Sequence, residues 1–177
     1  MNPEPNTSAE KAENRQLVLF VMADSEFGLD ISHVREVIRV PEITHMPRTP
    51  RFVEGIINLR GRILPVLDLK KRFGLPATQE TPLTRVKIVE WKGQIIGFWV
   101  DCVKEVLRVP VSNIAKPPDM ILTIAGQYLE GIVEVKDRLL ILLDMDRILN
   151  QEEIRHLADT EFAEAAAAAR EADPHGD

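Results

Sequence analysis

Arg60 is the residue of this sequence whose type and position best suit a specific contact. It stands in the polar run Asn58-Leu59-Arg60-Gly61, between two apolar runs, and Arg62 follows closely. A guanidinium group on a rigid turn can make two parallel hydrogen bonds to a carboxylate with little loss of entropy. We therefore expect Arg60 to contact a partner, although most arginines in turns are simply solvated.

Catalytic chemistry finds little support among the other polar residues. Asp24 and Asp68 could form a carboxylate pair by chance, but nothing around them predicts a pocket that excludes water. Asp68 and Asp144 hold matching places before short predicted helices, which favours helix capping over acid–base chemistry. No metal-ligand spacing, nucleophile elbow or phosphate loop occurs. We expect no enzyme activity, no metal and no cofactor; an enzyme stays the main alternative from another class, because a fold alone never excludes catalysis.

The element that must position Arg60 is a predicted hairpin from Phe52 to Leu69. β-branched residues in short runs on both sides of the polar turn favour strands over helices. Asn58 and Gly61 suit a tight connection, since both residue types tolerate a positive φ. The sequence therefore predicts that Arg60 projects from a hairpin turn.

The same stretch occurs a second time in the chain. Two pairs of segments match, at offsets that differ: Phe52–Ile57 with Tyr128–Val133, and Val34–Pro41 with Val103–Pro110. The difference predicts an insertion, Val111–Gln127, in the second copy. Two related halves joined near residues 75–82 are the simplest account.

Short helices are predicted beside the strands. We expect Ser32 to cap one whose first turn runs from His33 to Glu36, and Cys102–Val106 to repeat that turn. Asp68 is expected to cap a helix over Leu69–Phe73.

Many short apolar strands at hairpin spacing predict an all-β fold, with barrels or sandwiches as the leading options. A duplicated unit of about five strands would close as two small barrels that share a core. Gln151–Asp173 is helical by propensity and would add a C-terminal helix.

The amino-acid composition limits which classes of partner the protein can bind and in which cellular compartment it is expected. The net charge of -6 argues against a nucleic-acid surface, so a nucleic-acid-binding barrel is a weaker alternative. Met1–Asn14 is polar and lacks the apolar core of a secretory signal, and no apolar run is long enough to span a membrane. Cys102 is the single cysteine, which excludes a disulfide framework within one chain. We expect a cytoplasmic protein.

Three motifs carry a resemblance to a known family. Asn58-Leu59-Arg60-Gly61, preceded by Phe27-Gly28-Leu29-Asp30-Ile31 and Val34-Arg35-Glu36-Val37, resembles the CheW family of bacterial chemotaxis coupling proteins. The resemblance implies two intertwined five-stranded SH3-like β-barrels in a CheW-like domain over residues 15–158. A disordered leader, 1–14, would precede this domain, and an Ala-rich acidic helical tail, 159–177, would follow it.

The resemblance also implies a non-catalytic adaptor. One surface would bind the regulatory domain of the histidine kinase CheA, and another the cytoplasmic tip of methyl-accepting chemoreceptors, in arrays at the membrane. The receptor contact is expected in the groove between the barrels, at Val34, Glu36, Asn58 and Arg60; the kinase contact is expected on outer apolar faces, at Val106 and Leu107. Glu36 would supply a charge opposite to Arg60 if the barrel brings the two together. An asparagine at the position of Asn58 more often forms a turn than binds a partner. A small β-barrel adaptor of another signalling system is the alternative.

Overall fold

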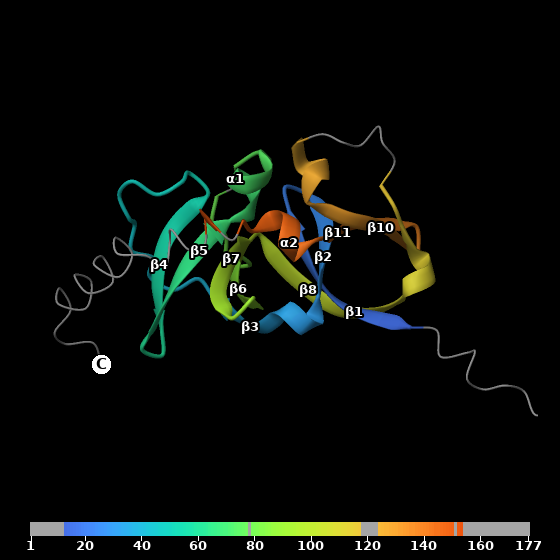
Figure 1. Cartoon of the computed structure of the whole chain (residues 1–177), viewed down its shortest axis with the longest axis horizontal. Helices are drawn as coiled ribbons and strands as arrows, with labels where there is room; N and C mark the ends of the chain where they lie inside the picture. The colour runs from blue at the N-terminus through green and yellow to red at the C-terminus, as the bar shows by residue number, and fades with distance from the viewer. Residues whose placement is uncertain (1–12, 78, 118–123, 151, 154–177) are drawn as a thin grey trace, which may run out of the picture.

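The computed structural model describes residues 13–77, 79–117, 124–150 and 152–153, and in it the chain forms two β-sheets set side by side (Figure 1). The predicted tail 159–177, nearly all of the predicted C-terminal helix and residues 1–12 of the predicted leader lie outside these residues.

One sheet has five strands and is built from a continuous part of the chain. In spatial order its strands are β3 (Val34–Arg39), β6 (Arg85–Trp91), β7 (Gln94–Val100), β5 (Arg62–Asp68) and β4 (Val53–Leu59). A cluster of buried aliphatic side chains that includes Ile57, Leu64 and Val86 lies within it, with Ile38 and Leu59 of the two edge strands packed against the cluster. We call this sheet and its interior the five-stranded barrel.

The other sheet combines the first two strands with the last four. In spatial order its strands are β8 (Cys102–Pro110), β1 (Asn14–Met22), β2 (Ser25–Asp30), β11 (Arg138–Leu143), β10 (Leu129–Val135) and β9 (Ile114–Ala115). Its interior cluster includes Leu17, Leu19, Leu140 and Leu142. We call it the six-stranded barrel, although β9 adds only two residues to a five-strand core.

The two barrels are related by the duplication, and each takes strands from both halves of the chain. β2 pairs in parallel with β11, placing Gly28 opposite Leu142, and β7 pairs in parallel with β5, placing Gly97 opposite Val66. The hairpin β1–β2 of the first half thus joins strands of the second, and β6–β7 of the second half joins strands of the first. The predicted architecture of two intertwined barrels is confirmed.

A third and larger core lies between the barrels and joins them. Four of its aromatic rings follow one another from β1 to the 3-10 helix η4 (Ile124–Tyr128): Phe20 and Phe27 have centroids 5.9 Å apart, Phe27 and Phe73 6.3 Å, and Phe73 and Tyr128 4.7 Å. Aromatic contacts at these separations are favourable beyond the area that they bury. We refer to this layer as the shared core.

The helix α1 (Leu69–Phe73) forms as predicted. The carboxylate of Asp68 accepts hydrogen bonds from the backbone N–H groups of Lys70 and Lys71, and the helix ends at Gly74 with φ 69°. Asp144 caps α2 (Met145–Ile148) in the same way. Among the described residues no helix is long and apolar enough to cross a membrane.

Two other helix predictions are wrong. Asp30, not Ser32, caps a single 3-10 turn, η1 (Ile31–His33), and the predicted helical residues after His33 lie in strand β3. Cys102–Val106 lies in strand β8 and not in a helical turn, and Cys102 is half-buried at its start. In both places β-branched residues pair with a neighbouring strand, and this pairing outweighs the local capping signal.

Part of the predicted insertion is a counterpart of the first half. Beyond the 3-10 turn η2 (Val111–Asn113), Ala115 of β9 pairs with Ile132, as Thr44 bridges Ile56 in the first half. A Cβ atom on Gly55 would lie 2.2 Å from the Thr44 carbonyl oxygen, and one on Gly131 would lie 2.8 Å from that of Ala115. These glycines recur because a strand and the segment before it approach too closely for a side chain.

Candidate functional site

Arg60 projects from the turn between β4 and β5. The turn has two residues, Arg60 and Gly61, both at positive φ, and the Asn58 side chain accepts a hydrogen bond of 2.8 Å from the Gly61 N–H. Positive φ at both central positions is the geometry whose twist suits a two-residue hairpin. The Asn58 side chain thus helps to form the turn, and the Arg60 side chain is 73% exposed.

Glu36 lies directly against Arg60. Its carboxylate oxygens accept hydrogen bonds of 2.8 and 2.9 Å from the two terminal nitrogens of the Arg60 guanidinium. These hydrogen bonds, which Arg60 donates and Glu36 accepts, lower the pKa of the Glu36 carboxyl group and raise the pKa of Arg60. The predicted proximity of these two residues is confirmed.

The pair closes the seam of the five-stranded barrel. Glu36 belongs to β3 and Arg60 follows the last residue of β4, and these are the two edge strands of the sheet. The contact joins residues 24 positions apart in the sequence, and it bridges β3 and β4, which are not paired by backbone hydrogen bonds. Glu36 accepts from two of the five N–H donors of the guanidinium, so an oxygen of a partner, whether from a carboxylate or a carbonyl group, can bind the others.

Val34 is on the same strand as Glu36 but packs toward the shared core. It pairs with Val89 of β6, is half-buried and packs against the shared core. A bulge separates it from Glu36. The structure therefore brings Glu36, Asn58 and Arg60 to one end of the barrel and leaves Val34 near the shared core.

In the six-stranded barrel, ion pairs join β8, β2 and β11 instead of the two edge strands. Glu105, the counterpart of Glu36, lies 3.5 Å from Arg138. Arg138 also contacts Glu26 at 3.2 Å, and Lys104 contacts Glu26 at 2.5 Å. The hydrogen bond from Lys104 is the main cause of a lowered pKa at Glu26. The turn that matches Arg60 carries Lys136 at positive φ and makes no ion pair with the described residues.

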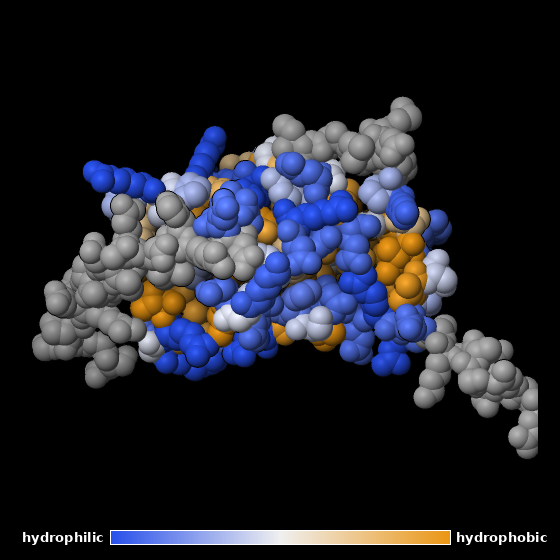
Figure 2. Space-filling view, viewed as in Figure 1, coloured by the Kyte–Doolittle hydropathy of each residue, from blue (hydrophilic) through white to orange (hydrophobic). Residues whose placement is uncertain are grey.

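The predicted kinase residues lie on β8, an edge strand of the six-stranded barrel. Val106 is 53% exposed, whereas Leu107 is half-buried and packs against the barrel interior. Leu139 of β11 is 65% exposed, and sequence reasoning missed it. Figure 2 shows apolar surface on both barrels, set in a mostly hydrophilic face.

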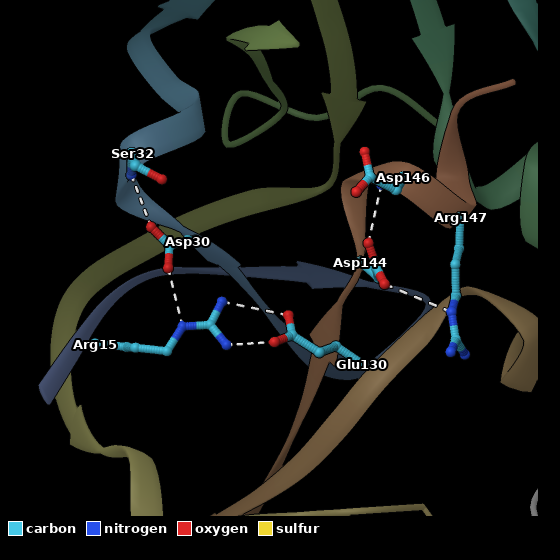
Figure 3. Close-up of polar contacts among 7 residues, drawn as sticks. All are labelled: Arg15, Asp30, Ser32, Glu130, Asp144, Asp146 and Arg147. Atoms are coloured by element: carbon cyan, nitrogen blue, oxygen red, sulfur yellow. Dashed lines mark hydrogen bonds and ion pairs between the residues drawn. The ribbon is translucent and has the colours of Figure 1, made fainter. Parts of the chain in front are cut away.

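A polar network that sequence reasoning also missed ties three strands of the six-stranded barrel together (Figure 3). Arg15 of β1 donates a hydrogen bond of 2.9 Å to the carboxylate of Asp30 on β2, and it also binds the carboxylate of Glu130 on β10. The contact with Glu130 raises the pKa of Arg15. Burial would raise the pKa of Asp30, but hydrogen bonds from Ser32 and Arg15 outweigh it and lower that pKa. Because Arg15 pairs with both carboxylates, the network serves the fold.

An open depression of about 680 Å³ lies where the two barrels meet. Residues of both barrels line it, among them Arg72 and Tyr128. Within it the indole N–H of Trp91 donates a hydrogen bond of 2.7 Å to the carboxylate of Asp146. None of the four predicted receptor residues lines this depression. The Glu36–Arg60 pair is therefore a site distinct from it.

Comparisons with known proteins agree on one family. Residues 16–153 match the family model described as the CheW-like domain. The chemotaxis protein CheW of Treponema pallidum is 33% identical over 151 residues, covering 83% of this chain and 89% of that protein. CheW of Klebsiella aerogenes is 31% identical over 140 residues, covering 79% of this chain and 84% of that protein. The crystal structure of the scaffolding protein TtCheW from Thermoanaerobacter tengcongensis matches with a TM-score of 0.73 and 40% identity, over 80% of this chain and 96% of that chain.

Proposed function

This chain belongs to the CheW family, and from that membership we propose that it is a chemotaxis adaptor that couples the histidine kinase CheA to methyl-accepting chemoreceptors. It acts by holding the two partners together and carries out no reaction of its own. Its working place is the cytoplasm, at membrane-bound receptor arrays.

The exposed Glu36–Arg60 pair is the observation that supports a receptor contact here. The pair presents both signs of charge, with Glu36 on strand β3 and Arg60 on a short turn that the Asn58 side chain helps to fix. A receptor tip is a helical hairpin, and fixed charges beside an apolar surface suit its recognition. The receptor surface of the proposal consists of Glu36, Asn58 and Arg60, with Val34 at its inner margin.

The kinase surface of the proposal is on the other barrel. Val106 exposes an apolar side chain on an edge strand, and Leu107 supports it from the barrel interior. An apolar side chain that is removed from water on binding contributes favourably to a protein contact. Because Val106 and Arg60 belong to different barrels, one adaptor can bind the kinase and the receptor at the same time.

Calorimetry with the isolated CheA regulatory domain tests this proposal. Wild type and Arg60→Glu are expected to bind alike, and Val106→Asp to bind about tenfold more weakly or not at all. Leu83→Asp is the matched control, because Leu83 is 60% exposed and lies outside both proposed surfaces. No binding by wild type to the kinase of its own cell would refute the coupling role and leave an adaptor of another signalling system.

A receptor-tip fragment tests the other surface. Arg60→Glu is expected to lose binding while Lys136→Glu, at the equivalent turn of the other barrel, keeps it. Equal losses in both variants would show that net charge, not the Glu36–Arg60 site, governs the contact.

A further inference from the structure

The two barrels carry opposite charge. Residues 31–100, which form η1, the five-stranded barrel and α1, contain twelve Lys and Arg against six Asp and Glu. The other described residues contain seven Lys and Arg against thirteen Asp and Glu. The first group is thus basic in a chain whose net charge is -6. Such a division creates a field that attracts an acidic partner to one end of the molecule.

Some of the basic side chains are without a counter-ion. Arg48 and Arg51 are exposed in the loop between β3 and β4, and neither makes an ion pair or a hydrogen bond with the described part of the chain. Arg48 also has a positive φ of 63°. Strongly hydrophilic side chains project into solvent at this end of the five-stranded barrel, at the upper left of Figure 2. We call residues 46–52 the basic loop.

The C-terminal part of the described chain ends beside this loop. Arg72 of α1 donates hydrogen bonds of 3.3 and 2.9 Å to the carboxylate of Glu153, the last described residue. The same guanidinium lies 4.5 Å from the centroid of the Phe52 ring. Glu153 is therefore held next to Phe52, the neighbour of Arg51.

The segment that follows Glu153 is acidic. Residues 154–177 contain six Asp and Glu and two Arg. At about 3.3 Å per residue, even a few residues of chain span the distance from Phe52 to Arg48. A tether this short gives the segment an effective concentration of roughly millimolar at the basic loop, so weak ion pairs suffice for binding.

We propose that the acidic segment 154–177 docks on the basic loop of its own chain, pairing with Arg48 and Arg51. The docked segment neutralises the basic end of the five-stranded barrel and competes with acidic partners for it. The proposal does not depend on the adaptor function.

A spin label in the acidic segment tests the docking directly. The full chain carries Cys102→Ser and a nitroxide on Ala168→Cys, and amide NMR signals are recorded with the label oxidised and then reduced. At low salt, the backbone amides of Arg48, Thr49 and Arg51 are expected to lose about half of their intensity or more. At about 0.5 M NaCl, where the Debye length falls to about 4 Å, the intensity is expected to return.

Matched variants separate docking from general attraction. Arg48→Gln with Arg51→Gln is expected to abolish the broadening, whereas Arg108→Gln with Lys136→Gln, which removes two exposed cations from the other barrel, is expected to leave it intact. Unbroadened amides in the basic loop, or broadening that survives the Arg48 and Arg51 changes, would overturn the proposal. A second sample mixes two preparations, one isotope-labelled without the nitroxide and one with the nitroxide but without isotopes. Broadening in this mixture would assign the contact to a second copy of the chain, and would also overturn the proposal.

Discussion

The amine nitrogen of Lys87 lies 3.4 Å from the centroid of the Phe20 ring, beside the shared core. The Lys87 side chain is fully buried, and its nitrogen has no hydrogen-bond partner among the described residues. Burial lowers its pKa well below the ordinary value of 10.5. Lys70 is also buried, but it binds Asp101 at 2.5 Å. The two lysines therefore have opposite consequences for stability.

Lys87→Met is expected to raise the free energy of unfolding, by about 1–4 kcal/mol at pH 7, because an apolar chain of similar volume replaces an unpaired buried amine. Lys70→Met is the control, and should lower that free energy by about 2 kcal/mol because Asp101 loses its ion pair with Lys70. Urea unfolding followed by circular dichroism measures both changes. A destabilised Lys87→Met would mean that the amine has a favourable partner in solution.

Stability is expected to rise with pH in wild type and not in Lys87→Met. The folded-state pKa of Lys87 is below its unfolded value, so between these two values folding releases a proton. The free energy of unfolding is therefore highest above the pKa that Lys87 has in the unfolded chain. It decreases as the pH falls toward the pKa of Lys87 in the folded state, with a slope of up to about 1.4 kcal/mol per pH unit. Denaturant titrations from pH 7.5 to 9.5 compare the slopes of the two proteins. Parallel slopes would show that Lys87 stays charged when folded.

Reversing the Glu36–Arg60 pair separates its two roles. Glu36→Arg with Arg60→Glu retains an ion pair across the seam of the barrel, so the midpoint of thermal unfolding should stay within about 2 °C of wild type. Receptor binding should nevertheless be lost, because each charge then faces the partner with the wrong sign. Calorimetry against a receptor-tip fragment measures this. If the reversed pair binds as well as wild type, the pair serves only to close the seam.

Gly55→Ala is expected to destabilise the chain by about 3 kcal/mol or more, because its Cβ would lie 2.2 Å from the Thr44 carbonyl oxygen. Gly61→Ala, at φ 84° with no atom within 4 Å of its Cβ, isolates the backbone strain and should cost about 1 kcal/mol. Chemical denaturation of both variants gives the difference. Equal losses would mean that the segment at Thr44 moves aside freely.

Patterns among residues that are close in sequence correctly predicted several elements of the fold. The Asp68 cap, the hairpin at Arg60 and the duplication all follow from residues close together in sequence or from direct comparison of two stretches. Only the first part of β3, residues 34–36, was wrongly predicted, because a plausible cap at Ser32 competed with strand pairing to β6. That pairing joins residues about fifty positions apart. Long-range pairing leaves no mark in the spacing of nearby residues.

The site was predictable only in part for the same reason. Glu36 and Arg60 were suggested by type and resemblance, but their closure of the seam depends on how the edge strands meet. The burial of Lys87 ran against its residue type, since lysines are rarely buried without a partner. Arg15 gave no signal, because its partners lie 15 and 115 positions away.

The order of strands has a consequence for synthesis on the ribosome. The five-stranded barrel uses β3 to β7 and can pair all its strands once Val100 has emerged, whereas β1 and β2, which emerge first, lack their outer neighbours until β8 and β11 follow. The earliest hairpin must therefore wait, with its apolar faces uncovered, for a strand that ends at Leu143. A nascent chain arrested before β11 would hold one finished barrel and one exposed hairpin, which is the kind of apolar surface that chaperones cover.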